Sequence, residues 1–345
     1  MSSHVLISGA TGFIAGHTIA ALLADGYTVT GTVRDAINVG PTAHLRALPG
    51  AAERLRLVSA DLLTPGAFDA HAAVADYVLH MASPFQMTVA DPARDLVEPA
   101  VRGTASMLEA CAKSPRVKRV VVTSSMAAVT DEPDINHVLT EADWNEKSSL
   151  TRNPYYFSKV SAERAAWDFQ QRRQPSWSLL TINPFIVIGP APVKTVNESN
   201  KIFVDLMNGA YPAIMGLTWG FVDVRDVAAA HVRALTAPQA SGRYLCAGAT
   251  RSMRDVVALL RANGFAHTRL PRFGLDSPFG NQLSLLASYT QPQGVRSYLR
   301  SHLGRVPRYD TSKITRDLAI EFRNVDDSII ETCRDLQRWG HVATA

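Results

Sequence analysis

The segment His-Val-Leu-Ile-Ser-Gly-Ala-Thr-Gly-Phe-Ile-Ala-Gly, residues 4–16, decides the fold of this 345-residue chain. Its first five residues are an apolar run typical of a buried strand, and a glycine-rich turn then leads into a helical run over residues 17–25. Such a turn lets the backbone approach a pyrophosphate closely and points the N-terminus of the helix at it. Gly26 ends the helix and residues 27–33 alternate as a second strand. The segment therefore predicts a complete β-α-β unit.

Apolar runs continue to alternate with helical stretches along the first half of the chain. We expect further strands at residues 55–59, 77–80, 117–123 and 178–182. Strands that alternate with helices form a parallel sheet that is covered on both faces. The sequence therefore predicts an α/β fold of the Rossmann type, a doubly wound parallel sheet with a smaller, mostly C-terminal substrate lobe.

The pattern changes after residue 182. Residues 183–192, Asn-Pro-Phe-Ile-Val-Ile-Gly-Pro-Ala-Pro, contain three prolines and lead into a stretch rich in Met, Phe, Tyr and Trp. We expect residues 1–183 and 221–250 to form the dinucleotide-binding domain, and residues 184–220 and 251–345 to form the substrate-binding lobe. Asp226 is expected to cap the N-terminus of a helix over residues 227–235.

The composition excludes several classes of protein. The chain is 46% hydrophobic and 19% charged, as expected of a soluble globular protein. Its three cysteines are far apart and no two of its ten histidines lie within four residues of each other, so we expect no metal and a reducing, cytoplasmic location. The net charge of +4 comes from dispersed C-terminal arginines without periodic aromatics, which argues against nucleic acid. Glycines and hydroxyl residues interrupt the uncharged first 24 residues, which argues against a membrane anchor. A monomer or homodimer is expected.

The end of the second predicted strand indicates which dinucleotide is bound. NAD-binding proteins carry an acid there, which takes the ribose 2′-hydroxyl, whereas Arg34 follows the strand here. Because an arginine attracts a 2′-phosphate that a carboxylate would repel, Arg34 favours NADPH. The adjacent Asp35 leaves NADH as a lesser alternative. Further cofactor contacts are expected at the ends of the third and fourth strands, namely Asp61 and Leu62 at the adenine, and Met81, Ala82 and Ser83 over the diphosphate.

Residues 153–164 predict a helix that carries a tyrosine and a lysine on one face. Asn153 is expected as its N-cap and Pro154 as its first residue, so that Tyr155 lies in the first turn and Lys159 one turn further on. An unpaired tyrosine has a pKa near 10, and we expect the cation of Lys159 to lower it. The pair is therefore a candidate acid/base unit. The alternative is a core tyrosine beside a solvated lysine.

A serine pair closes the fifth predicted strand at the edge of the sheet where ligands bind. The hydroxyl of Ser125 can hydrogen-bond a substrate oxygen there, and Ser124 takes this position if the register differs by one. The alternative is a buried or turn-forming serine. The chain has no G-x-S-x-G motif, which argues against a hydrolase triad.

These motifs together resemble the extended short-chain dehydrogenase/reductase family, in particular its dihydroflavonol reductase-like branch, which includes cinnamoyl-CoA reductases and microbial aldehyde or ketone reductases. The matching motifs span almost the whole chain in the order of the family. They are Gly-Ala-Thr-Gly-Phe-Ile at 9–14, Thr-Val-Arg-Asp at 32–35, Thr-Ser-Ser at 123–125, Tyr155 with Lys159, Ile-Asn-Pro at 182–184, Phe-Val-Asp-Val-Arg-Asp-Val at 221–227 and Tyr-Asp-Thr-Ser-Lys at 309–313.

The resemblance implies a role for each matching residue. Ser125 would orient the substrate carbonyl, Tyr155 would donate its proton, and Lys159 would assist Tyr155 and hold the nicotinamide ribose. Pro184 and Val187 would flank the nicotinamide. The cofactor would be NADP(H), bound through Arg34 and through the glycine turn, of which the contacting residues are Gly9, Thr11, Gly12, Phe13 and Ile14.

Three features depart from the family. Ala15 stands where the third glycine usually does, and Thr130 stands where plant flavonoid reductases have an asparagine that contacts substrate hydroxyls. A second basic residue at the 2′-phosphate is missing, because Gly40 and Pro41 occupy that area.

We expect an apolar substrate pocket and a small-molecule carbonyl substrate. The predicted lining is Phe85, Met126, Thr130, Phe185, Met207, Tyr211 and Trp219. Such a lining favours a bulky aromatic or aliphatic compound, although several of these residues could belong to the core instead. The leading hypothesis is NADPH-dependent reduction of an aldehyde or ketone to an alcohol.

Four alternatives remain open. An acyl-CoA reductase is suggested by C-terminal cations that could meet CoA phosphates, namely Arg269, Arg272, Arg296, Arg300, Arg305 and Arg308, although a solvated surface explains them as well. A 3β-hydroxysteroid dehydrogenase or a nucleotide-sugar epimerase would use the same three catalytic residues. A non-catalytic NADP-sensing protein would not need them.

Overall fold

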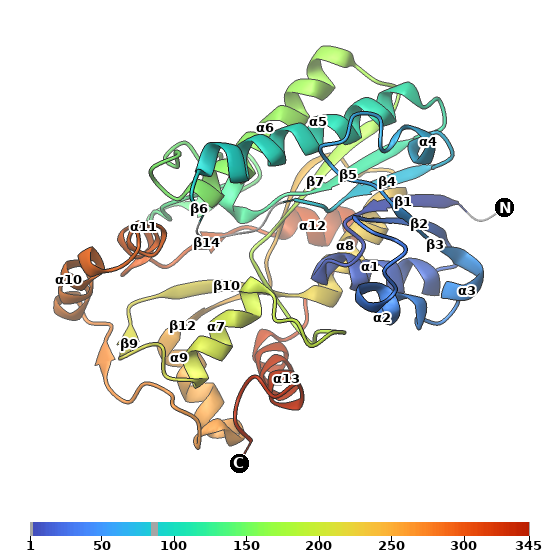
Figure 1. The fold of residues 1–345 in the computed structure, drawn as a ribbon. Coiled ribbons are helices and arrows are strands. Elements are labelled where there is room, and N and C mark those ends of the chain that lie inside the picture. Colours follow the sequence, from blue (N-terminus) through green and yellow to red (C-terminus); the bar gives the residue numbers. More distant parts are fainter. Residues whose placement is uncertain (1–2, 84–88, 345) are drawn as a thin grey trace.

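The computed structural model describes residues 3–83 and 89–344, and it is built on a central sheet of seven parallel strands (Figure 1). The strand order is β11-β7-β5-β4-β1-β2-β3, which reverses between β1 and β4. The strands are β1 His4–Ser8, β2 Thr28–Val33, β3 Leu55–Ser59, β4 Tyr77–His80, β5 Arg119–Thr123, β7 Ser178–Pro184 and β11 Gly242–Cys246. The predicted Rossmann-type fold is confirmed.

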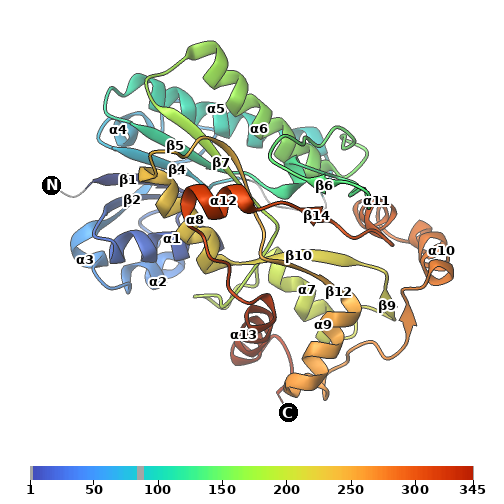
Figure 2. The ribbon, with the colours of Figure 1, turned by 180° about the vertical axis from the view of Figure 1, so that it is seen from behind.

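Helices cover both faces of this sheet (Figures 1 and 2). The helices α5 Glu98–Lys113 and α6 Pro154–Arg173 pack side by side on one face, and α1 Phe13–Ala24 and α8 Val224–Thr236 pack on the other. Shorter helices lie near the sheet, namely α2 Ala43–Arg46, α3 Ala51–Arg54, α4 Asp69–Ala72 and α12 Ser312–Leu318. Residues 93–97 and 261–265 form π-helical turns, and residues 40–42, 126–128 and 288–290 form 3₁₀ turns.

The central strands read as largely apolar runs because both of their faces are buried, whereas the edge strand β3 is only partly buried. In β1, Val5 and Ile7 pack against α1 and α8, while Leu6, between them, packs against α5 and α6. All three side chains are fully buried. Burial of such a side chain contributes about 2 kcal/mol to the stability of the fold. The hydrophobic clusters on the two faces of the sheet therefore hold the strand ends, and the residues that follow them, in fixed positions.

The rest of the chain forms a smaller lobe on three-stranded and two-stranded sheets. In the three-stranded sheet, β10 Thr218–Asp223 pairs with β8 Ile186–Ile188 in parallel and with β12 Ala249–Ser252 in antiparallel register. The two-stranded pairs are β9 Ile214–Met215 with β13 Gly274–Leu275, and β6 Val138–Leu139 with β14 Arg308–Tyr309. The remaining helices are α7 Glu198–Met207, α9 Met253–Leu260, α10 Pro278–Ala287, α11 Gln293–His302 and α13 Val325–Arg338.

Several predicted boundaries differ from the structure. The strand β7 runs two residues beyond the predicted end, since Asn183 and Pro184 still pair with β11, and β5 begins at Arg119 rather than at residue 117. The prediction that Asp226 caps α8 is wrong. Asp223 is the N-cap and accepts a hydrogen bond from the amide of Arg225, while Asp226 accepts one from the amide of Arg323. The division into two domains stays a prediction.

Within the described residues, no helix is both long and apolar enough to span a bilayer. The same residues contain no cluster of three or more His, Cys, Asp or Glu side chains that could hold a metal ion.

Candidate active site

The glycine turn lies where the strand order reverses, between the carboxyl ends of β1 and β4. The hydroxyl oxygen of Ser8 accepts hydrogen bonds from the amides of Met81 and Ala82, both at 3.0 Å, and this ties the two strand ends together. Gly9 has a φ of 71°, and a Cβ there would lie 3.0 Å from the Cα of Ala82. Only glycine fits both the backbone angle and this close approach.

The turn leaves an open cradle at the N-terminus of α1. Thr11 and Gly12 are exposed, Gly12 provides no side-chain cap, and the first turn of α1 has no acidic residue. Phe13 and Ile14 are half-buried against the core. Free backbone N–H groups at a helix N-terminus attract anions. The cradle therefore fits the diphosphate of a dinucleotide.

Two exposed arginines lie beside the loop that follows β2. Arg34 comes directly after the strand, and Arg46, from α2, donates a hydrogen bond from Nη2 to the carbonyl of Ala36 at 3.4 Å. Neither takes part in an ion pair with another described residue. The carboxylate of Asp35 instead accepts hydrogen bonds from the amides of Ile37 and Asn38. Arg46 was not predicted from the sequence, because it lies beyond the Gly40–Thr42 turn. This turn brings Arg46 back to the loop that follows β2.

The other predicted cofactor residues also lie at this edge of the sheet. Asp61 is exposed and accepts a hydrogen bond from the amide of Leu63, and Leu62 packs against Gly103 of α5. Ala82 and Ser83 line a small cavity together with Lys159. Met81 is partly buried against the core. Phe85 lies outside the described residues.

The predicted catalytic residues come together where α6 begins. The side chain of Ser125 hydrogen-bonds Tyr155, and its oxygen also accepts a hydrogen bond from the amide of Ala127 at 3.1 Å. The Nζ atom of Lys159 lies 5.6 Å from the centre of the Tyr155 ring. Ser124 donates its hydroxyl hydrogen to Glu163 instead. The structure therefore brings Ser125, and not Ser124, to Tyr155.

The electrostatics of this group differ from the expectation. Burial raises the pKa of Tyr155 well above its usual value, and the hydrogen bond with Ser125 opposes this effect. Burial also lowers the pKa of Lys159 to about 8. The pKa of Tyr155 is therefore raised and not lowered as expected, because the effect of burial exceeds that of the hydrogen bond with Ser125.

The start of α6 is held by Asn153 in an unusual way. Asn153 is the N-cap as predicted, but it adopts a left-handed conformation with a φ of 48° and its side chain does not cap the helix. The side-chain amide instead donates hydrogen bonds to Asp131 and to Ser301 of α11, the latter at 3.1 Å. This amide therefore connects the catalytic helix to the lobe.

A cavity of about 810 Å³ lies between these residues and the lobe. Ser125, Tyr155 and Pro184 form one part of its wall. Of the predicted substrate residues, Met126, Thr130, Phe185, Tyr211 and Trp219 line it. Met207 does not belong to its described lining, because α7 turns this side chain into the core of the lobe, where it is 1% exposed. Val187 is buried in the main core.

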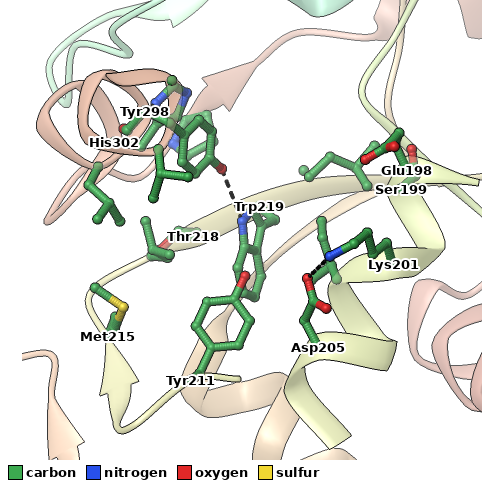
Figure 3. Close-up of a pocket in the computed structure, with 18 of the residues that line it drawn as sticks. Glu198, Ser199, Lys201, Asp205, Tyr211, Met215, Thr218, Trp219, Tyr298 and His302 are labelled. Atoms are coloured by element: carbon green, nitrogen blue, oxygen red, sulfur yellow. Dashed lines mark hydrogen bonds and ion pairs between the residues drawn. The ribbon is translucent and has the colours of Figure 1, made fainter. Parts of the chain in front are cut away.

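Part of the cavity wall was not predicted. Figure 3 shows Tyr298 and His302 of α11 across from Tyr211, with Trp219 donating its indole hydrogen to the Tyr298 oxygen at 3.1 Å. Burial lowers the pKa of His302 to about 4, so it is neutral at pH 7. The helix α7 adds polar groups, namely Glu198, Ser199 and the ion pair of Lys201 with Asp205.

The six C-terminal arginines do not belong to the described cavity lining. Arg305 pairs with Glu132, and Arg296 and Arg300 both lie over the ring of Tyr289. These contacts give three of the six arginines partners on the protein itself, which weakens their interpretation as a CoA-binding cluster.

The fold, the glycine cradle and the Ser-Tyr-Lys group define a nicotinamide-dependent oxidoreductase of the extended short-chain dehydrogenase/reductase class. Residues 5–247 match the model of the NAD dependent epimerase/dehydratase family, and the chain belongs to this family.

Its relatives are reductases. The chain is 42% identical to cinnamoyl-CoA reductase CAD2 of Medicago truncatula, over 96% of this chain and 95% of the relative. Its fold is similar to that of Gre2 from Candida albicans in complex with NADPH, with a TM-score of 0.81, 32% identity and coverage of 98% and 99% of the two chains. It is also similar to the yeast methylglyoxal/isovaleraldehyde reductase Gre2 complexed with NADPH, with a TM-score of 0.78, 28% identity and coverage of 98% and 100%.

Proposed function

We propose that the protein is an NADPH-dependent reductase that converts a bulky, apolar or aromatic aldehyde or ketone to an alcohol. One observation carries the proposal: the hydrogen-bonded hydroxyls of Ser125 and Tyr155 form part of the wall of a large cavity that is otherwise mainly apolar. A carbonyl oxygen held against both hydroxyls receives two hydrogen bonds while the body of the substrate fills the apolar part.

The preference for NADPH is supported by the positive charge beside β2. Arg34 and Arg46 are exposed at the same loop, and neither is neutralised by a described carboxylate. Asp35, the group that would favour NADH, uses its carboxylate to hold the backbone of the loop. Two guanidinium groups suit a 2′-phosphate because each can donate several hydrogen bonds to phosphate oxygens.

The proposed chemistry assigns one proton movement to the protein. Bound NADPH supplies the hydride that the carbonyl carbon accepts. Tyr155 gives its phenolic proton to the carbonyl oxygen, and Ser125 donates a hydrogen bond to the same oxygen as negative charge develops there. Lys159 is protonated at pH 7, since its pKa is about 8. Its cation stabilises the phenolate that Tyr155 becomes.

Reduction of an acyl-CoA thioester is the second candidate. It is favoured by the 42% identity to a cinnamoyl-CoA reductase over nearly the whole chain. The outcome differs chemically from carbonyl reduction, because a thioester gives an aldehyde and releases a free thiol.

The two candidates are tested with an aromatic aldehyde and the CoA thioester of the matching acid, each with NADPH and with NADH. Cofactor oxidation with the aldehyde alone supports the carbonyl reductase, whereas thiol release from the thioester supports the second candidate. An epimerase would show no net cofactor oxidation. Binding of NADPH without turnover of the thioester or of any member of a broad carbonyl panel would support a sensor and refute both proposals.

The role of Tyr155 is tested by Tyr155→Phe. We expect kcat to fall by about 100- to 10,000-fold, the usual contribution of a positioned acid, with unchanged affinity for NADPH measured by fluorescence. Tyr27→Phe, at the opposite end of the sheet, serves as the control and should keep full turnover. Wild-type turnover of Tyr155→Phe would refute the assignment.

A further inference from the structure

A third polar residue lies on the face of α6 that carries Tyr155 and Lys159. Glu163 follows one turn after Lys159 and two turns after Tyr155, so the three side chains lie along one side of the helix. The side chain of Glu163 is fully buried. A buried carboxylate is costly unless it is paired and hydrogen-bonded, so its partners decide what it does.

Glu163 is hydrogen-bonded to strands that surround the site. Its Oε2 accepts hydrogen bonds from Ser124, which follows β5, and from the side-chain amide of Asn183 in β7, the latter at 2.7 Å. Its Oε1 accepts hydrogen bonds from Thr181 of β7 at 3.0 Å and from Nε of Arg243 in β11 at 2.6 Å. One carboxylate therefore fixes the catalytic helix to three neighbouring strands, β5, β7 and β11.

Asn183 extends this network to the catalytic serine. Its Nδ2 donates one hydrogen to Glu163 and lies 3.2 Å from the carbonyl oxygen of Ser125, to which it donates the other. The network thus joins the backbone of Ser125 to the helix that carries Tyr155. Asn183 is 0% exposed, so water does not compete for these hydrogen bonds.

The charge of Glu163 is balanced away from the reacting groups. Arg243 is its buried ion-pair partner, stacks on the Trp144 ring at 3.8 Å and donates hydrogen bonds to the carbonyls of Glu141 and Asp143. Burial alone accounts for the lowered pKa of Lys159. The charge of Glu163 is therefore paired within the network itself.

We propose that Asn183 and Glu163 are positioning residues, which hold the hydroxyl of Ser125 at the distance from Tyr155 at which both can contact one carbonyl oxygen. The proposal rests on the proposed reductase function. Without the amide of Asn183, the carbonyl of Ser125 keeps its hydrogen bond with the amide of Ala128 but loses its own link to the carboxylate on α6, so the two hydroxyls converge less closely. Misplacement of about 1 Å can cost roughly 100-fold in rate.

The test is a double-mutant cycle of Asn183→Ala and Ser125→Ala, with kcat, KM and the dissociation constant of NADPH measured for each protein. We expect Asn183→Ala to lower kcat by about 10- to 100-fold and to change KM and NADPH affinity by less than about twofold. In the Ser125→Ala background the same substitution should change kcat by less than about twofold, since there is no serine hydroxyl left to position.

A matched control is Asn200→Ala in the lobe. Asn200 is also buried, and its amide also donates to a backbone carbonyl, that of Gly189, but it has no contact with Glu163 or Ser125 in the described structure. We expect it to lower the melting temperature and to leave kcat unchanged. The cycle is repeated with Glu163→Gln, which keeps the volume of the side chain, so that the test does not depend on the folding of one variant.

The outcomes separate the inference from the function on which it rests. An unchanged kcat in folded Asn183→Ala and Glu163→Gln, or equal losses with and without Ser125, would overturn the positioning role while leaving the reductase intact. Failure of the wild-type protein to oxidise NADPH with any carbonyl compound would instead refute the proposed function, and the inference with it.

Discussion

Replacement of Lys159 by methionine should abolish catalysis and at the same time stabilise the fold. The ammonium group is buried beneath the active site, and burial lowers its pKa from 10.5 to about 8. At 1.36 kcal/mol per pKa unit, holding this charge at pH 7 costs the folded protein about 3 kcal/mol. The contact of Nζ with the Tyr155 ring, at 5.6 Å from the ring centre, offsets about 1 kcal/mol of this cost. We therefore expect Lys159→Met to be about 2 kcal/mol more stable than the wild type at pH 7.

The dependence on pH provides a second check of the same reasoning. Between pH 8 and 10.5 the unfolded chain keeps the lysine proton and the folded chain has lost it, so this residue makes the wild type more stable as pH rises. Lys159→Met lacks this contribution, and the stability difference between the two proteins should shrink across that window. The assay is urea unfolding without cofactor at pH 7 and near pH 10. A variant that is less stable than the wild type at pH 7 would refute the reasoning.

Two further substitutions address the cofactor. Arg46→Ala should weaken NADPH binding by about tenfold and leave NADH binding unchanged, since it removes a charge-assisted contact to the 2′-phosphate; fluorescence titration with both cofactors measures this. The control is Arg56→Ala, because Arg56 is an exposed arginine at the N-terminal end of β3. Equal losses of affinity for NADPH and NADH in Arg46→Ala would contradict the assignment. Gly9→Ala should lower the free energy of unfolding by about 2–4 kcal/mol, from backbone strain and overpacking against Ala82, and should weaken both cofactors alike. Chemical denaturation that shows wild-type stability would count against the close approach described here.

Much of the fold could be predicted because its signals are local. The runs of β1, β3 and β4 have the same bounds in sequence and structure. In β1 and β4 burial on both faces leaves little but apolar residues, whereas the edge strand β3 is only partly buried. The start of α8 was missed because Asp223 and Asp226 are both acceptable caps. Asp226 does not cap the helix because its carboxylate accepts a hydrogen bond from Arg323, about a hundred residues further along the chain, and no local pattern indicates this contact.

In the site, too, features with a local sequence signal could be predicted, and features set by contacts between distant segments could not. The spacing of Tyr155 and Lys159 predicts that they share a helix face, but not that both are buried, which reverses the expected direction of the tyrosine pKa. Tyr298 and His302 carry no local signal of a pocket, because α11 reaches the cavity only through the packing of the lobe. Met207 was wrongly assigned to the pocket because it is an apolar residue close in sequence to residues that line it, whereas its side chain faces the core of the lobe.

The left-handed Asn153 has a consequence for attempts to change the substrate range. Its amide connects the first turn of the catalytic helix to Ser301. The helix α11 therefore lines the cavity and also helps to fix the position of the turn that carries Tyr155. Substitutions on α11 will therefore alter fit and chemistry together. The side-chain hydrogen bonds described for Asn200, Lys201 and Asp205 of α7 run to its N-cap Asn197, to Gly189 and within α7, so α7 is the side from which the cavity can be reshaped while the proton donor keeps its position.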